Sequence, residues 1–307
     1  MIILGLWPIA GITTVGVTPE DARQTIQTAI DCGITAFDTA FSYGYDGESD
    51  RYLGEAIAGQ RDRYTVIGKV GQRWTTDRKR VVDGSPGQLT ADAELSLRRM
   101  NADRFDVLFL HSPDPNVPIE TSAQAIADLR RRGLCDRVGI SNADVAQVQA
   151  FASVDGCDAV ECPLNLLQTD MLADFIPAAQ TLRSEVYCFW TLMKGLLAGA
   201  IKRDHVFADG DSRPGYDVFQ GEQLERAHCL VDGLREVGDR HGMTVSQLAV
   251  GWVLSQPGVT GTLVGARRPE QIRELAAARK LNSEVAEDVL RLKESFDRGK
   301  SIEISDT

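Results

Sequence analysis

Four side chains that handle protons stand at the ends of three consecutive apolar runs of the sequence. Asp38 ends the first run and Tyr43 follows it within a turn, Lys69 ends the second run, and His111 directly follows the third. The runs have the length and composition of buried strands. The carboxyl ends of parallel strands in a barrel meet at one rim, so we expect these four side chains to lie close together.

The chemistry of these four groups is complementary. A phenol is a weak acid with a pKa near 10, and a neighbouring ammonium group favours its phenolate form and makes proton donation easier. A carboxylate beside the lysine keeps the ammonium charged and oriented. A neutral imidazole can orient a carbonyl oxygen by a hydrogen bond. The set predicts protonation of an oxygen while hydride arrives at the attached carbon.

Each residue also has an ordinary structural explanation. A tyrosine after a strand often only packs, a lysine at a strand end is often a solvated charge, and an aspartate there often makes a turn. A lone histidine is more often structural than catalytic. The joint occurrence of all four types at adjacent strand ends favours the catalytic interpretation.

The elements that must position these residues alternate along the chain. Short apolar runs and amphipathic helical patterns follow one another about eight times without a break in composition. The strands are expected at 3–7, 34–38, 65–69, 105–110, 137–140, 159–162, 186–190 and 262–265. The helices are expected at 21–32, 49–58, 90–100, 121–132, from 143, 170–183, 221–241, 246–255, from 269 and 284–296. Residues 71–89 are expected to form a polar loop, with Thr90 as the cap of the next helix.

This alternation predicts an α/β protein with one domain over residues 1–307, a single (β/α)8 TIM barrel with extra helices near the C-terminus. The alternative is a doubly wound sheet that binds nucleotides. No early strand is followed by G-x-G-x-x-G or by a P-loop, which counts against that alternative.

Composition excludes several classes of function. The 307-residue chain has a formal charge of −11 and a pI near 4.9, which argues against a nucleic-acid partner. No run has the length of a membrane span, and the first residues lack the features of a secretory signal. The six cysteines form no C-x-x-C pair, and we expect reduced, mostly buried thiols and a cytoplasmic protein.

The sequence resembles the aldo-keto reductases over nearly its whole length. The segment Phe37-Asp38-Thr39-Ala40 followed by Tyr43-Gly44 is similar to the Asp and Tyr motif of that family, and Gly68-Lys69 and Leu110-His111 are similar to its Lys and His motifs. The resemblance implies that Tyr43 is the general acid and base, that Lys69 lowers its pKa, that Asp38 pairs with Lys69, and that His111 orients the carbonyl group.

The resemblance also implies a nicotinamide cofactor. Gly139-Ile140-Ser141-Asn142 is similar to the family segment whose Ser and Asn bind the nicotinamide carboxamide, and Phe189 falls where an aromatic side chain stacks on the nicotinamide ring. The remaining segments resemble the pyrophosphate loop (Leu192, Lys194, Gly195, Leu196) and the adenosine-phosphate segment (Gly265, Arg267, Arg268, Gln271). Arg267 and Arg268 favour NADPH (NADP⁺), with NADH as the alternative, although both arginines could instead be solvated rim charges.

Three features depart from the family pattern. Glu161 stands where the family usually has a Gln facing the carboxamide, and Leu275 stands where many members have Asn near the adenine. We also expect no small N-terminal hairpin across the barrel floor. An ionised Glu161 would favour the oxidised cofactor by its charge, whereas a protonated or averted Glu161 would leave the cofactor preference unchanged.

The sequence does not name the substrate beyond a small carbonyl or alcohol compound. A sugar lactol, an aldehyde and a ketone all remain open, and Trp7 and Trp74 could wall an apolar substrate pocket or simply pack. A regulatory or redox-sensing subunit that binds NADPH with slow or no turnover is the competing function. A metal-dependent hydrolase would need clustered His and carboxylate ligands, of which only His111 is suitably placed, so no metal is expected.

Overall fold

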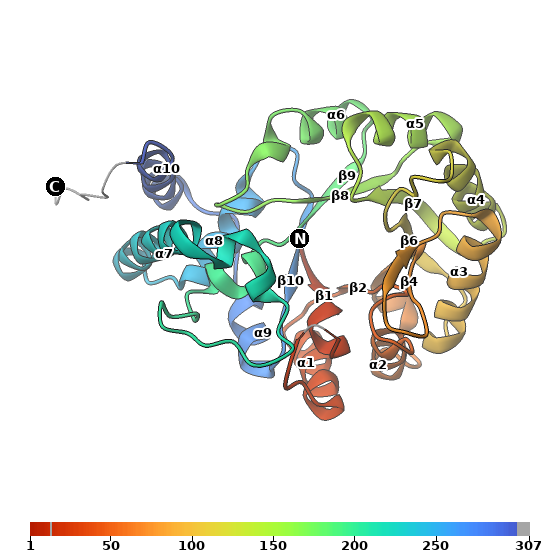
Figure 1. The fold of residues 1–307 in the computed structure, drawn as a ribbon, viewed down its shortest axis with the longest axis horizontal. Helices are drawn as coiled ribbons and strands as arrows, with labels where there is room; N and C mark the ends of the chain where they lie inside the picture. Colours follow the sequence, from red (N-terminus) through yellow and green to blue (C-terminus); the bar gives the residue numbers. More distant parts are fainter. Residues whose placement is uncertain (13, 300–307) are drawn as a thin grey trace.

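Eight parallel strands close into a barrel, and most of the helices surround it (Figure 1). The computed structural model describes residues 1–12 and 14–299. Around the barrel the strands are ordered β1-β2-β3-β6-β7-β8-β9-β10, and β10 pairs back to β1. Their bounds are β1 Ile2–Gly5, β2 Ala36–Asp38, β3 Thr65–Val70, β6 Phe105–Leu110, β7 Cys135–Ser141, β8 Ala159–Pro163, β9 Glu185–Phe189 and β10 Gly261–Gly265. The predicted (β/α)8 barrel is confirmed.

The outer layer consists of helices that follow the strands. They are α1 Pro19–Asp31, α2 Glu48–Ala56, α3 Pro86–Met100, α4 Ile119–Arg131, α5 Val145–Asp155, α6 Phe175–Thr181, α7 Gly221–His241, α8 Val245–Ser255, α9 Pro269–Ala276 and α10 Ser283–Asp297. Short 3-10 turns cover Trp7–Ala10, Arg61–Arg63, Asp170–Leu172, Met193–Ala198, Arg213–Gly215 and Asp217–Phe219. Helices α7 and α10 pack on each other and are the predicted extra helices.

Alternation along each strand divides the core into two parts. The inward side chains fill the barrel and include Ile3, Ala36, Ile67, Phe109 and Tyr187. The outward side chains pack against the helices in a much larger apolar layer. Phe109 fits inside because Gly139 on the neighbouring strand lacks a side chain, and a Cβ there would lie 2.6 Å from the Phe109 ring.

The segment after β3 differs from the expected polar loop. It forms a hairpin of β4 Gln72–Trp74 and β5 Arg80–Val82, and α3 then begins at Pro86. The expected cap at Thr90 is wrong, because Ser85 occupies the N-cap position and Pro86 has the backbone angle that suits a first helical turn. Thr90 lies inside the helix.

Other differences lie at element ends. The first strand ends at Gly5, and Trp7 belongs to a 3-10 turn. The expected helix over 170–183 is divided into a 3-10 turn and α6. Four of the six free cysteines are buried, as expected. No helix in the described part of the chain is both long and apolar enough to cross a membrane.

Candidate active site

The last inward position of most barrel strands carries a residue that faces the site. Lys69 comes two residues after the inward Ile67, and Asp38 comes two residues after the inward Ala36. His111, Glu161 and Phe189 follow inward residues of β6, β8 and β9 by the same interval. Side chains two apart on a strand point to the same face, so the barrel interior leads directly into a polar rim.

The four proton-handling side chains come together at this rim. The Lys69 ammonium forms an ion pair with Asp38. The Tyr43 hydroxyl lies 3.4 Å from Lys69 Nζ and 3.4 Å from Asp38 Oδ1. The Tyr43 and His111 rings meet edge to face with centroids 5.9 Å apart. All four residues line one cavity of about 780 Å³.

Burial and charge set the protonation states of this cluster. Burial disfavours the Lys69 ammonium, but the Asp38 and Glu161 charges outweigh burial and raise its pKa, so Lys69 stays charged. Burial, and then the Lys69 charge, hold the pKa of His111 well below its usual range, so the imidazole is neutral at pH 7. A neutral imidazole is the form that the sequence predicts for orienting a carbonyl group.

The pKa of Tyr43 shifts in the direction opposite to the expected one, which was a lowering by Lys69. Burial raises the pKa of Tyr43, and the Lys69 charge only partly opposes this effect, while Asp38 and Glu161 add to it. Burial is the main reason why the pKa is not lowered, as it would be by one lysine alone, and the two carboxyl groups contribute less. Tyr43 is therefore held as a neutral phenol, which is the proton-donating form.

Glu161 belongs to the same cluster. Its Oε2 lies 3.4 Å from Lys69 Nζ and 3.3 Å from Ser141 Oγ, while its Oε1 is buried with no hydrogen-bond partner among the described residues. Burial, with the Asp38 charge adding to it and Lys69 opposing it, raises the pKa of Glu161 to about 8. Burial also raises the pKa of Asp38, although that carboxyl contacts Lys69 directly. With a single ammonium for two carboxyls, the proton resides on the more distant Glu161 at neutral pH.

The cavity extends from this cluster towards the ends of β9 and β10. Ser141, Asn142, Phe189, Leu192, Lys194, Gly195, Gly265, Arg267, Gln271 and Leu275 line it. Lys194 Nζ lies 4.6 Å and 4.1 Å from the ring centroids of Trp190 and Tyr216. The loops after the last two strands commonly bind phosphate groups in such barrels. A long, partly polar channel with an unpartnered carboxyl oxygen at one end and arginines at the other fits an extended dinucleotide.

Two residues of the predicted cofactor set lie elsewhere. Leu196 is fully buried in the apolar core and does not line the cavity. Arg268 points away from the cavity and pairs with Asp21 of α1, at 2.9 Å between Nη1 and Oδ1. Trp7 and Trp74 do line the cavity, and the Trp7 ring meets the Tyr43 ring edge to face at 5.1 Å.

Several cavity residues were not predicted from the sequence. Trp190 and Tyr216 enclose Lys194, and Arg213, which is paired with Asp211, faces the same channel as Arg267. Gln72 and Arg80 reach the cavity from the unexpected hairpin. Residues 72–82 show no alternation of apolar and polar side chains, so the sequence holds no strand signal for that hairpin.

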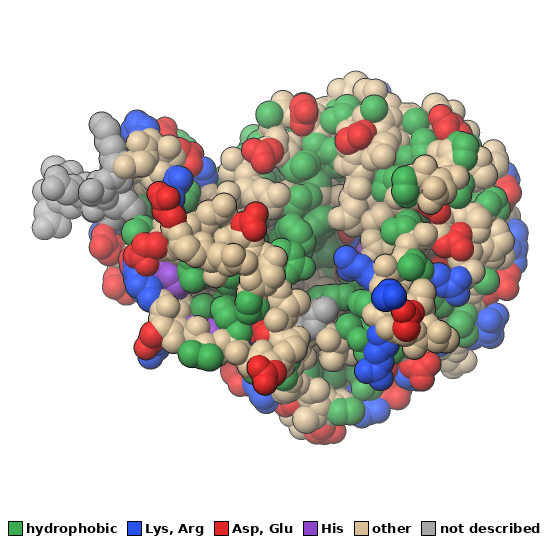
Figure 2. Space-filling view, in the orientation of Figure 1, with side chains coloured by type: hydrophobic (Ala, Val, Ile, Leu, Met, Phe, Trp, Pro, Cys, Tyr) green, Lys and Arg blue, Asp and Glu red, His purple; other side chains and the backbone are tan. Residues whose placement is uncertain are grey.

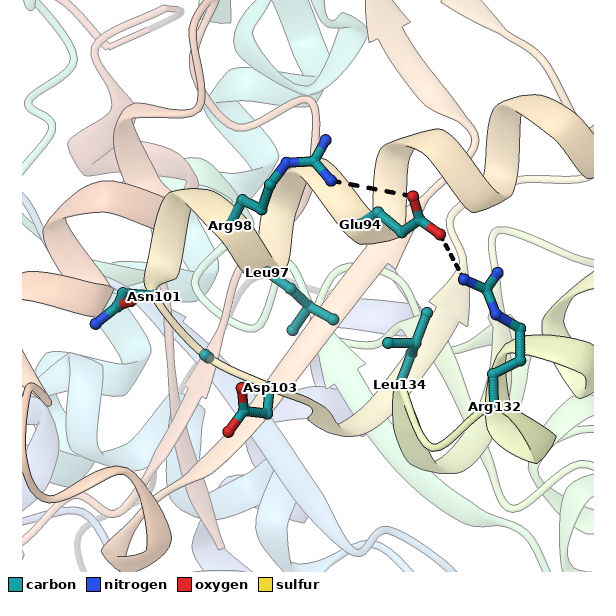
Figure 3. A pocket seen from close by; sticks show the side chains of 8 residues that line it. Glu94, Leu97, Arg98, Asn101, Asp103, Arg132 and Leu134 are labelled. Carbon is teal, nitrogen blue, oxygen red and sulfur yellow. Dashed lines mark hydrogen bonds and ion pairs between the residues drawn. The ribbon is translucent and has the colours of Figure 1, made fainter.

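A second hollow of about 500 Å³ lies at the opposite ends of the strands, between α3 and α4 (Figure 3). Glu94 forms ion pairs there with Arg98 and Arg132, so the charged groups satisfy one another (Figure 3). In such barrels, residues at the N-terminal ends of the strands usually contribute to stability rather than to catalysis. Among residues 1–12 and 14–299, no three His, Cys, Asp or Glu side chains are grouped so that they could hold a metal ion.

Comparison with known proteins agrees with this geometry. The sequence model of the Aldo/keto reductase family matches residues 1–295. The chain is 32% identical over 291 residues to the aldo-keto reductase YhdN of Bacillus subtilis (strain 168), covering 93% of this chain and 87% of that protein. It is 27% identical to the NADH-specific methylglyoxal reductase of Escherichia coli (strain K12), covering 94% and 92%.

Solved structures show the same fold. The glycerol dehydrogenase AKR11B4 from Gluconobacter oxydans superposes with a TM-score of 0.87 at 29% identity, covering 100% of this chain and 94% of that one. The aldo-keto reductase AKR11C1 from Bacillus halodurans superposes with a TM-score of 0.76 at 19% identity, covering 95% and 91%. With the family model matching nearly the whole chain, this protein belongs to the aldo/keto reductase family of oxidoreductases that use nicotinamide cofactors.

Proposed function

We propose that this enzyme reduces an aldehyde or ketone, or oxidises the corresponding alcohol or lactol, with Tyr43 as the proton donor. The observation that carries the proposal is the placement of the Tyr43 hydroxyl, 3.4 Å from both the Lys69 ammonium and the Asp38 carboxyl at the floor of the cavity. The nicotinamide cofactor supplies the hydride when it is bound. The side chains of this chain orient the carbonyl group and supply the proton.

Each residue of the cluster has a separate task. His111, held neutral by burial, donates a hydrogen bond to the carbonyl oxygen and aims it at Tyr43. Tyr43 transfers its proton to that oxygen, and the adjacent Lys69 ammonium stabilises the phenolate that remains. Asp38 fixes the ammonium in position through their ion pair.

The cofactor is held by residues along the channel. Ser141, Asn142, Phe189 and Lys194 all line the cavity. In the proposed complex Ser141 and Asn142 bind the carboxamide, Phe189 packs on the nicotinamide ring, and Lys194 meets the pyrophosphate. We propose a preference for NADPH over NADH. The support is that Arg267 lines the channel together with Arg213: burial, and then the Arg213 charge, lower the pKa of Arg267, and a phosphate group would offset the repulsion between the two arginines.

Replacing Tyr43 with Phe tests the proton donor. The variant keeps the ring and removes only the hydroxyl, so the dissociation constant of the cofactor should stay within about twofold. The rate constant for oxidation of bound NADPH by an aldehyde should fall roughly 100-fold or more, the usual scale of general acid catalysis. Stopped-flow fluorescence measures both quantities.

Near-normal single-turnover rates in Tyr43→Phe would show that another group donates the proton. Wild-type protein that binds NADPH but does not oxidise it across a panel of aldehydes and ketones would instead favour the non-catalytic, regulatory function.

A further inference from the structure

The β4–β5 hairpin brings a cation, the Arg80 guanidinium, to the substrate end of the cavity. Trp74 and Arg80 are directly opposite each other in the hairpin, and Gln72 shares their face because it lies two residues before Trp74. These three side chains line the cavity together with His111 and Ser112. Arg73 and Val81, the other opposed pair, lie on the outer face of the hairpin and do not line it.

The hairpin is held at a fixed place relative to the catalytic cluster. Trp74 Nε1 donates a hydrogen bond to the Ser42 carbonyl, at 2.8 Å, directly next to Tyr43. The base of the hairpin is closed by Asp83 N–H, which donates to the Gly71 carbonyl at 2.9 Å. The Arg80 guanidinium is close enough to His111 for its charge to contribute to the lowered pKa of that imidazole. Arg80 therefore stands over the same space that the carbonyl substrate must enter.

Within the described chain Arg80 has neither an ion pair nor an aromatic ring as a partner, whereas Lys79 has the first and Arg78 the second. Lys79 pairs with Asp77 at 2.8 Å, and Arg78 lies over the Tyr45 ring at 4.6 Å. Arg80 is exposed and makes no ion pair with any carboxylate among the residues described. Basic side chains gather on the hairpin side of the central hollow (Figure 2).

Gln72 supplies a second group without a partner. Its side chain is 7% exposed, its Nε2 donates to Ser112 Oγ, and its Oε1 is buried without a hydrogen bond from any described residue. Buried amide groups of this kind normally find partners, but Oε1 is an acceptor and cannot itself bind an oxyanion. A half-turn of the amide would exchange Nε2 and Oε1 and free the N–H donors for an oxyanion, provided that Ser112 Oγ turns its proton from the His111 carbonyl to Oε1.

We infer that Arg80 binds an oxyanion of the substrate, so that the enzyme acts on aldehydes or ketones that carry a carboxylate or phosphate group. This inference rests on the proposed carbonyl reduction and names its substrate class. The guanidinium matches both oxyanions geometrically, and the polar amide of Gln72 binds beside it. The local cations attract such substrates to the mouth against the negative charge of the whole protein.

Matched substrate pairs test the inference. The carboxylate arm compares 4-carboxybenzaldehyde with 4-methylbenzaldehyde, and succinic semialdehyde with butanal. The phosphate arm compares glyceraldehyde 3-phosphate with glyceraldehyde. Wild-type protein should show a kcat/KM at least tenfold higher for the anionic member of one arm. The arm with the larger ratio identifies the oxyanion.

Arg80→Met should remove most of this preference. The anionic substrate should lose about 10- to 100-fold in kcat/KM, mainly through KM, while its neutral partner changes less than about twofold. Arg80→Lys should restore part of the loss. Arg73→Met removes the same charge from the outer face of the hairpin and should keep the wild-type ratio.

A binding experiment makes the inference independent of turnover. With oxidised cofactor bound, which cannot deliver a hydride to an aldehyde, 4-carboxybenzaldehyde should quench tryptophan fluorescence at lower concentration than 4-methylbenzaldehyde, and Arg80→Met should abolish the difference. If neither aldehyde turns over, the proposed function fails while this binding difference still tests Arg80. Equal ratios for wild type and Arg80→Met in both experiments, or equal effects of Arg73→Met, would overturn the inference.

Discussion

Asp38 and Glu161 both approach the single ammonium group of Lys69. Lys69 forms its ion pair with Asp38 and lies 3.4 Å from Glu161 Oε2. Burial raises the pKa of Glu161 to about 8, so its carboxyl is mostly protonated at pH 7 and ionises as the pH rises through 8. Of the two interpretations that the sequence left open for Glu161, this arrangement favours the protonated carboxyl at neutral pH.

The pH dependence of cofactor binding follows from this assignment. An ionised Glu161 about 6 Å from the nicotinamide ring would favour its oxidised, cationic form by roughly 3 kcal/mol before screening, at an effective dielectric constant of about 20. The wild-type preference for NADP⁺ over NADPH should therefore rise several-fold between pH 6.5 and pH 9. Fluorescence titration gives the dissociation constants of NADP⁺ and NADPH at each pH. Protonation of the 2′-phosphate affects both constants equally, so it does not change their ratio.

Glu161→Gln provides the matched comparison for this effect. The variant should give the wild-type ratio at pH 6.5 and should show no rise towards pH 9, because an amide does not titrate. A rise of the same size in Glu161→Gln would assign the pH dependence to another group.

At the scale of elements, the start of α9 separates two adjacent arginines. Arg267 lines the channel, and its backbone N–H donates to Gln271 Oε1 at 2.8 Å. Arg268, the next residue, turns outward and connects α9 to α1 through its ion pair with Asp21. The proposed preference for NADPH therefore depends on Arg267, with Arg213 as the second cation of the channel.

Replacing each arginine in turn tests whether Arg267, and not Arg268, binds the cofactor. Arg267→Met should weaken NADPH binding at least tenfold relative to NADH, because a charge-assisted contact contributes about 1.5–3 kcal/mol. Arg268→Met is the control on the same helix and should change the NADPH to NADH ratio by less than about twofold. Equal dissociation constants for NADPH and NADH in the wild type would contradict the proposed preference.

At the scale of the whole molecule, the Glu161 carboxyl lowers the free energy of unfolding. The folded-state pKa of Glu161, about 8, lies above the unfolded value of about 4.3. As the pH rises between these values, the unfolded chain loses the proton first, so the folded state becomes less stable over this window. Each pH unit inside the window costs up to about 1.4 kcal/mol from this group.

Glu161→Gln should therefore be more stable than the wild type by a margin that grows with pH. Urea unfolding at pH 5, 7 and 8.5 measures the margin, which should increase by about 1 kcal/mol per pH unit and level off above pH 8. Glu222→Gln, at an exposed position of α7, controls for the loss of a formal charge. A margin independent of pH would show that Glu161 is already ionised in the folded protein.

The sequence by itself determined the barrel and the order of the site residues along it. Alternating apolar runs and helical patterns predict strands and helices locally, and strand periodicity then fixes which side chains share a face. Asp38, Lys69 and His111 were found because each stands at the end of such a run, where parallel strands must present their side chains together. The barrel architecture alone brings these residues together, without side-chain contacts that are particular to this protein.

Only the tertiary structure decided what depends on contacts between distant segments. Arg268 pairs with a residue 247 positions away, which no local pattern reveals. The sign of the Tyr43 pKa shift and the protonation of Glu161 depend on how far burial outweighs the charge of Lys69, and burial is a property of the packed barrel. The place of Arg80 depends on a hairpin that hydrogen bonds to distant segments hold, from Trp74 to the Ser42 carbonyl and from Gln72 to Ser112.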